Sequence, residues 1–150
     1  MNLRSLTMVG AMLLLAACAT GKSSSTTSGN AAPGSREDFV QNVGDRVFFD
    51  FDKSDIKPEG QQTLQRQAAW LKKYENVKVM VEGHCDDRGT REYNLALGNR
   101  RANAVKRALV ALGIPAGRIT TISYGKERPA VVGDNEQAWA QNRRGVTVIN

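Results

Sequence analysis

The sequence predicts an α+β fold, a two-layer α/β sandwich with two long helices on one face of a four-stranded sheet. Three observations support this prediction. Apolar and polar residues alternate along short segments, which is typical of half-buried strands. Between those segments, apolar residues recur at three- and four-residue spacing, as in amphipathic helices. The two kinds of segment also follow one another in the order β-α-β-α-β-α-β, which favours packed layers. Nothing in the pattern sets the order of the strands in the sheet.

The first half of the domain contains two strands and one helix. Residues 46–51 are rich in β-branched and aromatic side chains and are predicted to form a strand. A polar loop follows and ends at Pro58, a residue that suits the first turn of a helix. That helix carries Leu64 and Leu71 on one face. Valines alternate with other residues over 77–82, so we expect a second, half-buried strand there.

The second half repeats the same two patterns. Its predicted elements are a helix over residues 91–112, a strand over 118–124, a short helix over 135–142 and a strand over 146–149. Gly113 ends the long helix, because glycine readily takes the left-handed conformation at a helix C-terminus. Asp134 or Asn135 caps the short helix.

Residues 1–17 are predicted to be a signal peptide. Arg4 supplies a cationic start, and the apolar run that follows is about a dozen residues, fewer than the roughly 20 that span a bilayer. The signal ends in Leu-Ala-Ala-Cys, which resembles the bacterial lipobox, where cleavage precedes the Cys and its thiol carries the lipid. We therefore expect lipidation at Cys18, the alternative being an ordinary signal with an incidental Cys. Ala19, in place of the Asp that retains lipoproteins in the inner membrane, favours the outer membrane.

Residues 18–38 are predicted to be the lipidated Cys and a flexible tether. Their Ser, Thr and Gly residues are too small and polar to bury a core. A tether of about 20 residues reaches about 70 Å when taut, so the domain can stand off the membrane. The remaining residues, 39–150, suffice for one core and leave no room for a second domain.

Composition argues against several function classes. The formal net charge is +6, but basic and acidic residues are interspersed and aromatic residues make up only 6%. Nucleic-acid-binding proteins usually concentrate basic residues beside stacking aromatic ones, so no nucleic acid is expected. His84 is the only histidine, and it and Cys85 lack the partners that a metal site or an activated nucleophile needs. We expect no metal, no cofactor and no catalytic residue, and both side chains to be structural.

Asp86 and Arg101 are the candidate ligand clamp. Helical periodicity puts Asn94, Leu97 and Arg101 on one stripe, so Arg101 points toward the apolar side. A guanidinium in that position needs an anion or several acceptors, because an unpaired buried charge is costly. Asp86, just past the second predicted strand, is the obvious partner. A purely structural ion pair is the alternative.

Six blocks of sequence resemble the lipoprotein branch of the OmpA-like C-terminal domain family. They are Phe-Asp-Phe-Asp-Lys-Ser-Asp-Ile at 49–56, Gly-His-Cys-Asp-Asp-Arg-Gly-Thr at 83–90, Glu-Tyr-Asn at 92–94, Asn-x-x-Leu-Gly-x-x-Arg-Ala at 94–102, Ser-Tyr-Gly-Lys-Glu-Arg-Pro at 123–129 and Asn-Arg-Arg at 142–144. Cys85 and Gly98 depart from the broader family, which often has Thr and Ser there, but both recur in this branch.

The resemblance implies noncovalent binding of the meso-diaminopimelate in the peptide stem of peptidoglycan. In that reading Asp86 accepts from the ligand ammonium and Arg101 holds its carboxylate. The other implied contacts are the backbone amides near Phe51 and Asp52 and the side chains of Thr90, Asn94 and Leu97. Thr90 and Asn94 could equally cap the helix, and Leu97 could equally be a core residue.

The resemblance also implies a place in the cell. The domain would face the periplasm from a lipid anchor in the outer membrane and act in envelope integrity and cell division. Its protein partners would be TolB, contacted in part by residues 123–129, with TolA as a second candidate partner. A purely structural lipoprotein spacer, or a related lipoprotein outside that system, is the alternative.

Overall fold

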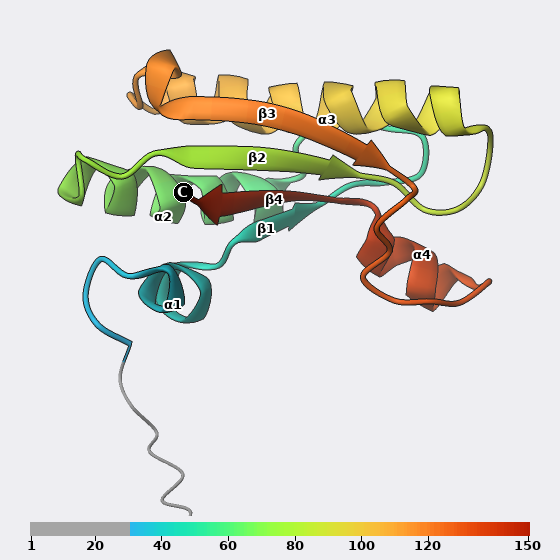
Figure 1. The fold of residues 1–150 in the computed structure, drawn as a ribbon, viewed down its shortest axis with the longest axis horizontal. Coiled ribbons are helices and arrows are strands. Elements are labelled where there is room, and N and C mark those ends of the chain that lie inside the picture. The colour runs from blue at the N-terminus through green and yellow to red at the C-terminus, as the bar shows by residue number, and fades with distance from the viewer. Residues whose placement is uncertain (1–30) are drawn as a thin grey trace, which may run out of the picture.

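The structure is a computed structural model that describes residues 31–150. The predicted signal peptide, the lipidation of Cys18 and most of the tether lie outside these residues. The elements, in order, are α1 (Arg36–Asp38), the π-helical turn η1 (Phe39–Val43), β1 (Arg46–Phe48), α2 (Pro58–Lys73), β2 (Val79–His84), α3 (Arg91–Ala111), the short turn η2 (Ala116–Arg118), β3 (Ile119–Gly125), α4 (Glu136–Asn142) and β4 (Arg144–Ile149) (Figure 1).

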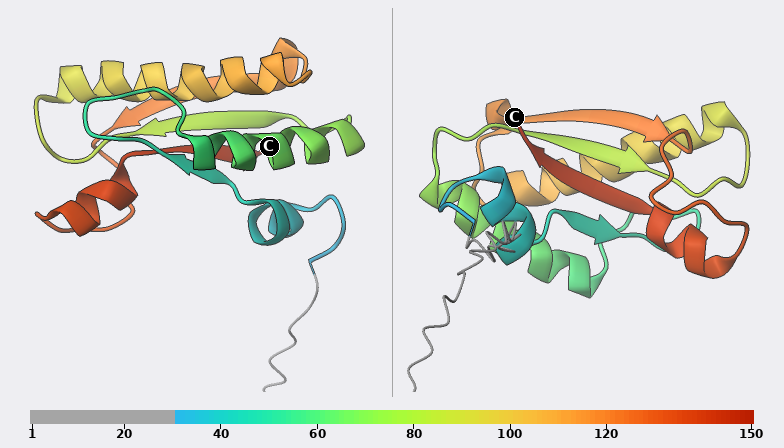
Figure 2. Two further views of the ribbon diagram at one scale, coloured as in Figure 1. Left: turned by 180° about the vertical axis from the view of Figure 1, so that it is seen from behind. Right: turned by 60° about the horizontal axis from the view of Figure 1, so that its bottom comes forward.

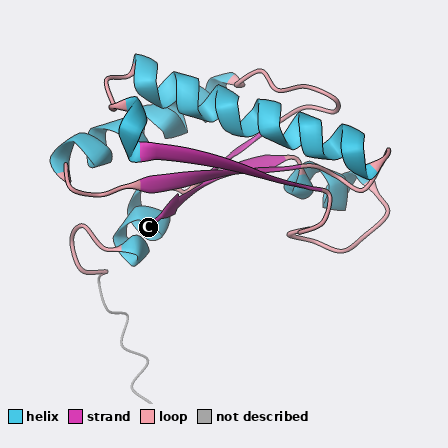
Figure 3. Ribbon diagram, turned by 45° about the horizontal axis from the view of Figure 1, so that its top comes forward, coloured by secondary structure: helices cyan, strands magenta, loops and turns pink. Residues whose placement is uncertain are grey.

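The four strands form one mixed sheet in the order β1-β4-β2-β3. β4 runs antiparallel to both of its neighbours, and β2 and β3 are parallel. The two long helices α2 and α3 cover one face of this sheet, as Figures 2 and 3 show from further directions. The α+β fold class with two helices on one face is therefore confirmed.

Several strand boundaries differ from the prediction. β1 ends at Phe48 rather than at residue 51, because the chain turns over residues 50–53, where Asp52 has a positive φ of 58°. The amide of Lys53 donates to the carbonyl of Asp50 at 3.2 Å and closes that turn. β2 begins and ends two residues later than the predicted segment, and β4 begins two residues earlier than predicted, since strand pairing rather than side-chain pattern sets where a ladder ends.

Ordered structure begins before residue 39, so the predicted tether boundary at residue 38 is too late. Ser35 caps α1 by accepting a hydrogen bond from the amide of Asp38 at 3.1 Å. Asp38 in turn accepts from the Trp70 indole at 2.9 Å, which joins this segment to α2. Phe39 is fully buried against Trp70, with ring centroids 4.9 Å apart. The Ser/Thr-rich residues that precede this short helix led to the prediction of a tether. The helix itself is stabilised by tertiary contacts, which a local composition does not reveal.

The helices pack closely on the sheet at one pair of glycines. A Cβ built on Gly83 of β2 would lie 1.7 Å from the carbonyl oxygen of Gly98 in α3. The α3 backbone therefore lies directly on β2, and Ser123 of β3 donates to the Leu95 carbonyl at 2.7 Å on the same side. This contact places the middle of α3 beside the end of β2, where the candidate site lies.

No helix within residues 31–150 has the length and apolar character needed to cross a membrane.

Candidate functional site

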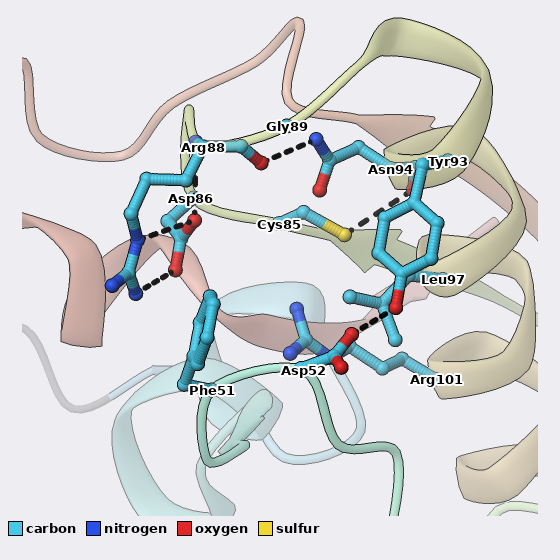
Figure 4. A pocket seen from close by; sticks show the side chains of 10 residues that line it. All are labelled: Phe51, Asp52, Cys85, Asp86, Arg88, Gly89, Tyr93, Asn94, Leu97 and Arg101. Carbon is cyan, nitrogen blue, oxygen red and sulfur yellow. Dashed lines mark hydrogen bonds and ion pairs between the residues drawn. The ribbon is translucent and has the colours of Figure 1, made fainter.

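A cavity of about 200 Å³ opens at the end of β2, between the β1–α2 loop, the β2–α3 loop and the first half of α3 (Figure 4). Its lining residues are Phe51, Asp52, Cys85, Asp86, Arg88, Gly89, Tyr93, Asn94, Leu97 and Arg101. The structure thus gathers six of the seven predicted binding residues around one cavity. The seventh, Thr90, does not line it and instead caps α3, where its hydroxyl accepts from the amide of Tyr93 at 3.1 Å.

Arg101 is a fully buried cation, with 0% of its surface exposed. Its guanidinium donates to three backbone carbonyls, those of Lys53 at 2.8 Å, His84 at 2.9 Å and Asp50 at 3.1 Å. Burial lowers its pKa from the ordinary value of arginine. A guanidinium has five N–H donors, so these three bonds leave two, one on each terminal nitrogen.

The expected direct partnership of Asp86 with Arg101 is therefore wrong. Within residues 31–150, the structure has no ion pair between these two side chains, and Arg101 donates instead to carbonyls of the β1–α2 loop and of the end of β2. Periodicity indicates that Arg101 is buried, but backbone acceptors leave no trace in a sequence because every residue carries one.

Asp86 pairs with two other arginines. Its carboxylate accepts from the Arg88 side chain at 2.7 and 3.2 Å and from the Arg88 backbone amide at 3.2 Å. The Nη1 of Arg143 lies 3.5 Å from Asp86 Oδ2. Burial alone would raise the pKa of Asp86, but hydrogen bonds from Arg88, together with the contribution of Arg143, lower it below its ordinary value of 3.8. Asp86, which is 4% exposed, is thus an anion at neutral pH.

Arg88 lies between two aromatic rings. Its guanidinium carbon is 3.9 Å from the centre of the Phe51 ring and 4.0 Å from that of Trp139. Such stacking is favourable for the planar guanidinium and orients it beside Asp86. Trp139 belongs to α4, so a helix far along the chain helps to build the wall of the site.

Arg143, which follows the last residue of α4, is the second arginine that contacts Asp86. Only 6% of the residue is exposed, and its side chain donates to the Phe49 carbonyl at 2.9 Å and to Glu136 at 2.7 Å. Sequence reasoning noted residues 142–144 as a family block but assigned them no role at the site. Arg88 and Trp139 were likewise missed, because their contact joins segments that are far apart in the chain.

Cys85 and Asn94 form the wall on the α3 side. The Cys85 thiol is 2% exposed and donates to the Asn94 carbonyl at 3.2 Å. Burial raises the pKa of this thiol, so it stays protonated. The Asn94 side-chain amide donates to the carbonyls of Arg88 and Thr90 at 2.8 and 3.0 Å, and thereby holds the turn before α3. The packing role expected for Cys85 is confirmed, and Leu97 both lines the cavity and is 4% exposed.

Tyr93 and Asp52 close the opposite side of the opening. The Tyr93 hydroxyl donates to the Asp52 carboxylate across the mouth of the cavity (Figure 4). This hydrogen bond is the main reason why the pKa of Tyr93 is raised. Tyr93 was not predicted as a site residue, although it follows Thr90 by less than one helical turn.

His84 is structural, as expected. It is 1% exposed, and its Nε2 lies 3.0 Å from Glu82 Oε2. Burial, followed by the nearby charge of Arg144, lowers its pKa, so the ring is neutral near pH 7. Within residues 31–150, no three His, Cys, Asp or Glu side chains come together in a way that could hold a metal ion.

The site can therefore bind a small zwitterionic group. It offers a buried carboxylate, Asp86, and two unused N–H donors of Arg101 around one cavity. A carboxylate recognises an ammonium, and a guanidinium recognises a carboxylate through charge-assisted hydrogen bonds.

Curated relatives share most of the chain. The protein named peptidoglycan-associated lipoprotein from Agrobacterium fabrum is 54% identical over 145 residues, which cover 91% of this chain and 82% of the relative. The protein of the same name from Haemophilus influenzae is 44% identical over 145 residues and is covered to 95%, as is this chain.

Solved structures agree with the fold. The peptidoglycan-associated lipoprotein of Burkholderia pseudomallei superposes with a TM-score of 0.73 at 39% identity, covering 77% of this chain and 100% of that one. The C-terminal domain of Helicobacter pylori MotB superposes with a TM-score of 0.64 at 22% identity, covering 69% of this chain and 81% of its own, and shares the fold. Residues 48–143 match the pattern that defines the OmpA family. On these grounds, and with four of the six predicted blocks lining one cavity, the chain belongs to the OmpA family.

Proposed function

We propose that this protein is an outer-membrane lipoprotein that binds peptidoglycan noncovalently through the cavity at the end of β2. The ligand is the free end of meso-diaminopimelate in the peptide stem, which carries an ammonium and a carboxylate on one carbon. Binding tethers the outer membrane to the cell wall. The names of the relatives, which include both peptidoglycan and lipoprotein, support the general role.

One observation carries the proposal. Asp86 and Arg101 are both buried at the same cavity, yet Asp86 pairs with Arg88 and Arg101 donates to backbone carbonyls, so the two do not bond to each other. A purely structural pair would bond directly, because two buried opposite charges gain most in contact. Because Asp86 and Arg101 are not bonded to each other, they can bind a ligand that carries an ammonium and a carboxylate on one carbon. The ammonium would meet Asp86, and the carboxylate would meet the two unused N–H donors of Arg101.

Asp86→Asn tests this assignment with little change in shape. Removing one member of a desolvated, charge-assisted contact costs about 2 to 5 kcal/mol, so sacculus binding should weaken by at least about thirtyfold. The matched control is Glu127→Gln. Glu127 is an exposed acid outside the cavity, and its carboxylate lies 2.7 Å from the Arg91 side chain. Binding that is equal in the two variants would contradict the proposal.

Ligand chemistry supplies a second test. A stem with lysine in place of diaminopimelate lacks the second carboxylate and would leave the free donors of Arg101 unpaired. Buried donors without partners are costly, so we expect much weaker binding of the lysine stem. Calorimetry with both soluble stem peptides measures this difference, and equal affinities would exclude the clamp. Binding of neither stem would favour a structural spacer.

We also propose that the domain acts in the Tol-Pal system through contact with TolB, and that TolA is a further candidate. Residues 123–129, the proposed part of that surface, end β3 and run into a turn. Lys126 in this turn donates to the carbonyls of Asp87 at 3.3 Å and Gly89 at 2.6 Å, both in the loop beside the cavity. A partner on this turn would therefore touch the loop that carries Asp86 and Arg88.

Charge reversal examines the partner assignment. Lys126→Glu with Arg128→Glu should weaken TolB binding in calorimetry, since loops on a rigid scaffold commonly carry such contacts. Lys106→Glu with Arg107→Glu, on the outer surface of α3, is the control for net charge. Unchanged TolB affinity in the loop variant would remove this turn from the interface.

A further inference from the structure

The Asp86 carboxylate, proposed above as the receptor for the ligand ammonium, is already engaged by a cation of the protein. Arg88 approaches Asp86 Oδ2 at 2.7 Å through Nη2 and Oδ1 at 3.2 Å through Nε, in the forked geometry of an arginine–carboxylate pair. The Arg88 backbone amide adds a third bond at 3.2 Å. An ammonium cannot occupy the same oxygens at hydrogen-bonding distance while this fork is closed.

We propose that Arg88 is an internal competitor, a side chain that occupies the ammonium position at Asp86 and has to release this carboxylate before the ligand can bind. This inference rests on the proposed function, and it concerns how that function is regulated. Arg88 thereby sets the affinity of the site below the value that Asp86 and Arg101 would reach alone.

Charge around the cavity supports displacement rather than sharing. Arg88 and Arg143 both lie against Asp86, and the buried Arg101 lines the same cavity. A ligand ammonium beside an unmoved Arg88 would bring a third cation to one carboxylate. Like charges in a poorly solvated site repel strongly. If Arg88 leaves, the ammonium takes over its charge and its hydrogen bonds.

The surroundings of Arg88 allow this movement. Arg143 is held from behind by Glu136 and the Phe49 carbonyl and is 8% exposed in its side chain, so it is fixed. The Arg88 side chain is 32% exposed and reaches solvent past the rings of Phe51 and Trp139. Of the two arginines that contact Asp86, only Arg88 has a side chain that can move into solvent. Phe51 also lines the cavity, so its ring is free to cover the ligand once Arg88 has moved.

Arg88→Gln tests the competition directly, because it removes the cation and keeps a side chain of similar length. With full-length protein in detergent, we expect a soluble stem peptide with meso-diaminopimelate to bind about tenfold more tightly, the usual worth of one charge-assisted contact. Any other peptide that places an ammonium on Asp86, the lysine stem included, should gain by the same factor. The reason is that release of Arg88 is a step common to both ligands.

Arg91→Gln is the matched control. Arg91 is three residues away, its side chain is 76% exposed, and it pairs with Glu127 outside the cavity. It reports the general effect of removing one positive charge on an anionic peptide. A role of Arg88 in holding a ligand carboxylate predicts the opposite result, weaker binding in Arg88→Gln than in Arg91→Gln. Equal or weaker binding, relative to this control, overturns the proposal.

A second measurement requires no substitution. In the native protein, the NMR signal of the Arg88 Nε–H should move to its solvent-exposed position on addition of the stem peptide, whereas that of Arg143 should stay. A stationary Arg88 signal at saturation also overturns the proposal. Failure of the proposed function is distinct, because the native protein would then not bind the stem or Asp86→Asn would bind it normally.

Discussion

Replacing Arg101 should damage the fold as well as the binding site. Its guanidinium is fully buried and joins the β1–α2 loop, through the carbonyls of Asp50 and Lys53, to the end of β2, through His84. Arg101→Ala removes the side-chain donor from three carbonyls, of which only that of Asp50 keeps the Lys53 amide as a donor, and opens a space beneath the cavity. No other described side chain donates to these carbonyls.

The size of the effect follows from those three bonds. An unsatisfied buried group costs about 1 to 3 kcal/mol, and water that enters the opened space recovers part of this. We therefore expect a loss of about 3 to 5 kcal/mol in the free energy of unfolding, a large share of the roughly 5 to 15 kcal/mol typical of a domain. Arg101→Lys should lose less, because an ammonium can still serve one or two of the carbonyls.

Urea unfolding at pH 7 measures this loss, with Asp86→Asn as the comparison. The side chain of Arg88, the main partner of Asp86, is 32% exposed and can turn to water once the carboxylate is gone, so Asp86→Asn should cost less stability than Arg101→Ala. Loss of binding in Asp86→Asn is thus a clean test of the ligand contact, whereas in Arg101→Ala it is mixed with unfolding. An Arg101→Ala protein within about 1 kcal/mol of the native stability would refute the structural role that we derive from the three carbonyls.

Further predictions concern the scaffold and the anchor. Gly83→Ala should lower the melting temperature sharply, because its Cβ would overlap the α3 backbone at 1.7 Å, whereas Gly117→Ala, with nothing within 4 Å, should be neutral. The Asp38 carboxylate has its pKa lowered from 3.8 to about 2, chiefly by hydrogen bonds from Asn42 and Trp70. Its stabilising contribution should be present above pH 3.8 and lost as the pH falls toward 2, which an NMR titration paired with acid unfolding would follow. Thr90→Ala should cost about 1 kcal/mol through loss of the α3 cap and leave stem binding nearly unchanged, since Thr90 does not line the cavity; a large drop in affinity would return it to the site. Cys18→Ala should abolish labelling with palmitate, and equal labelling of the native and variant proteins would exclude lipidation at this position.

The sequence by itself determined the layers and most of the site. Alternation and helical spacing identified the four strands and both long helices, because these patterns report which face of each element meets the core. Cavity residues such as Asp86 and Asn94 were found because they lie in blocks whose spacing resembles a family. Periodicity and motif spacing are local signals, so each can be recognised within one short segment of the chain.

Only the tertiary structure decided the order of the strands and the partners of each charge. Arg101 was recognised as buried, but its acceptors are carbonyls contributed by the β1–α2 loop and β2, and a carbonyl has no signature in the sequence. The pairing of Arg88 with Asp86 between Phe51 and Trp139 depends on α4 returning to the end of the sheet. Periodicity indicates which face of a helix or strand a side chain occupies. Its bonding partner depends on distances between segments, which are set only when the chain has folded.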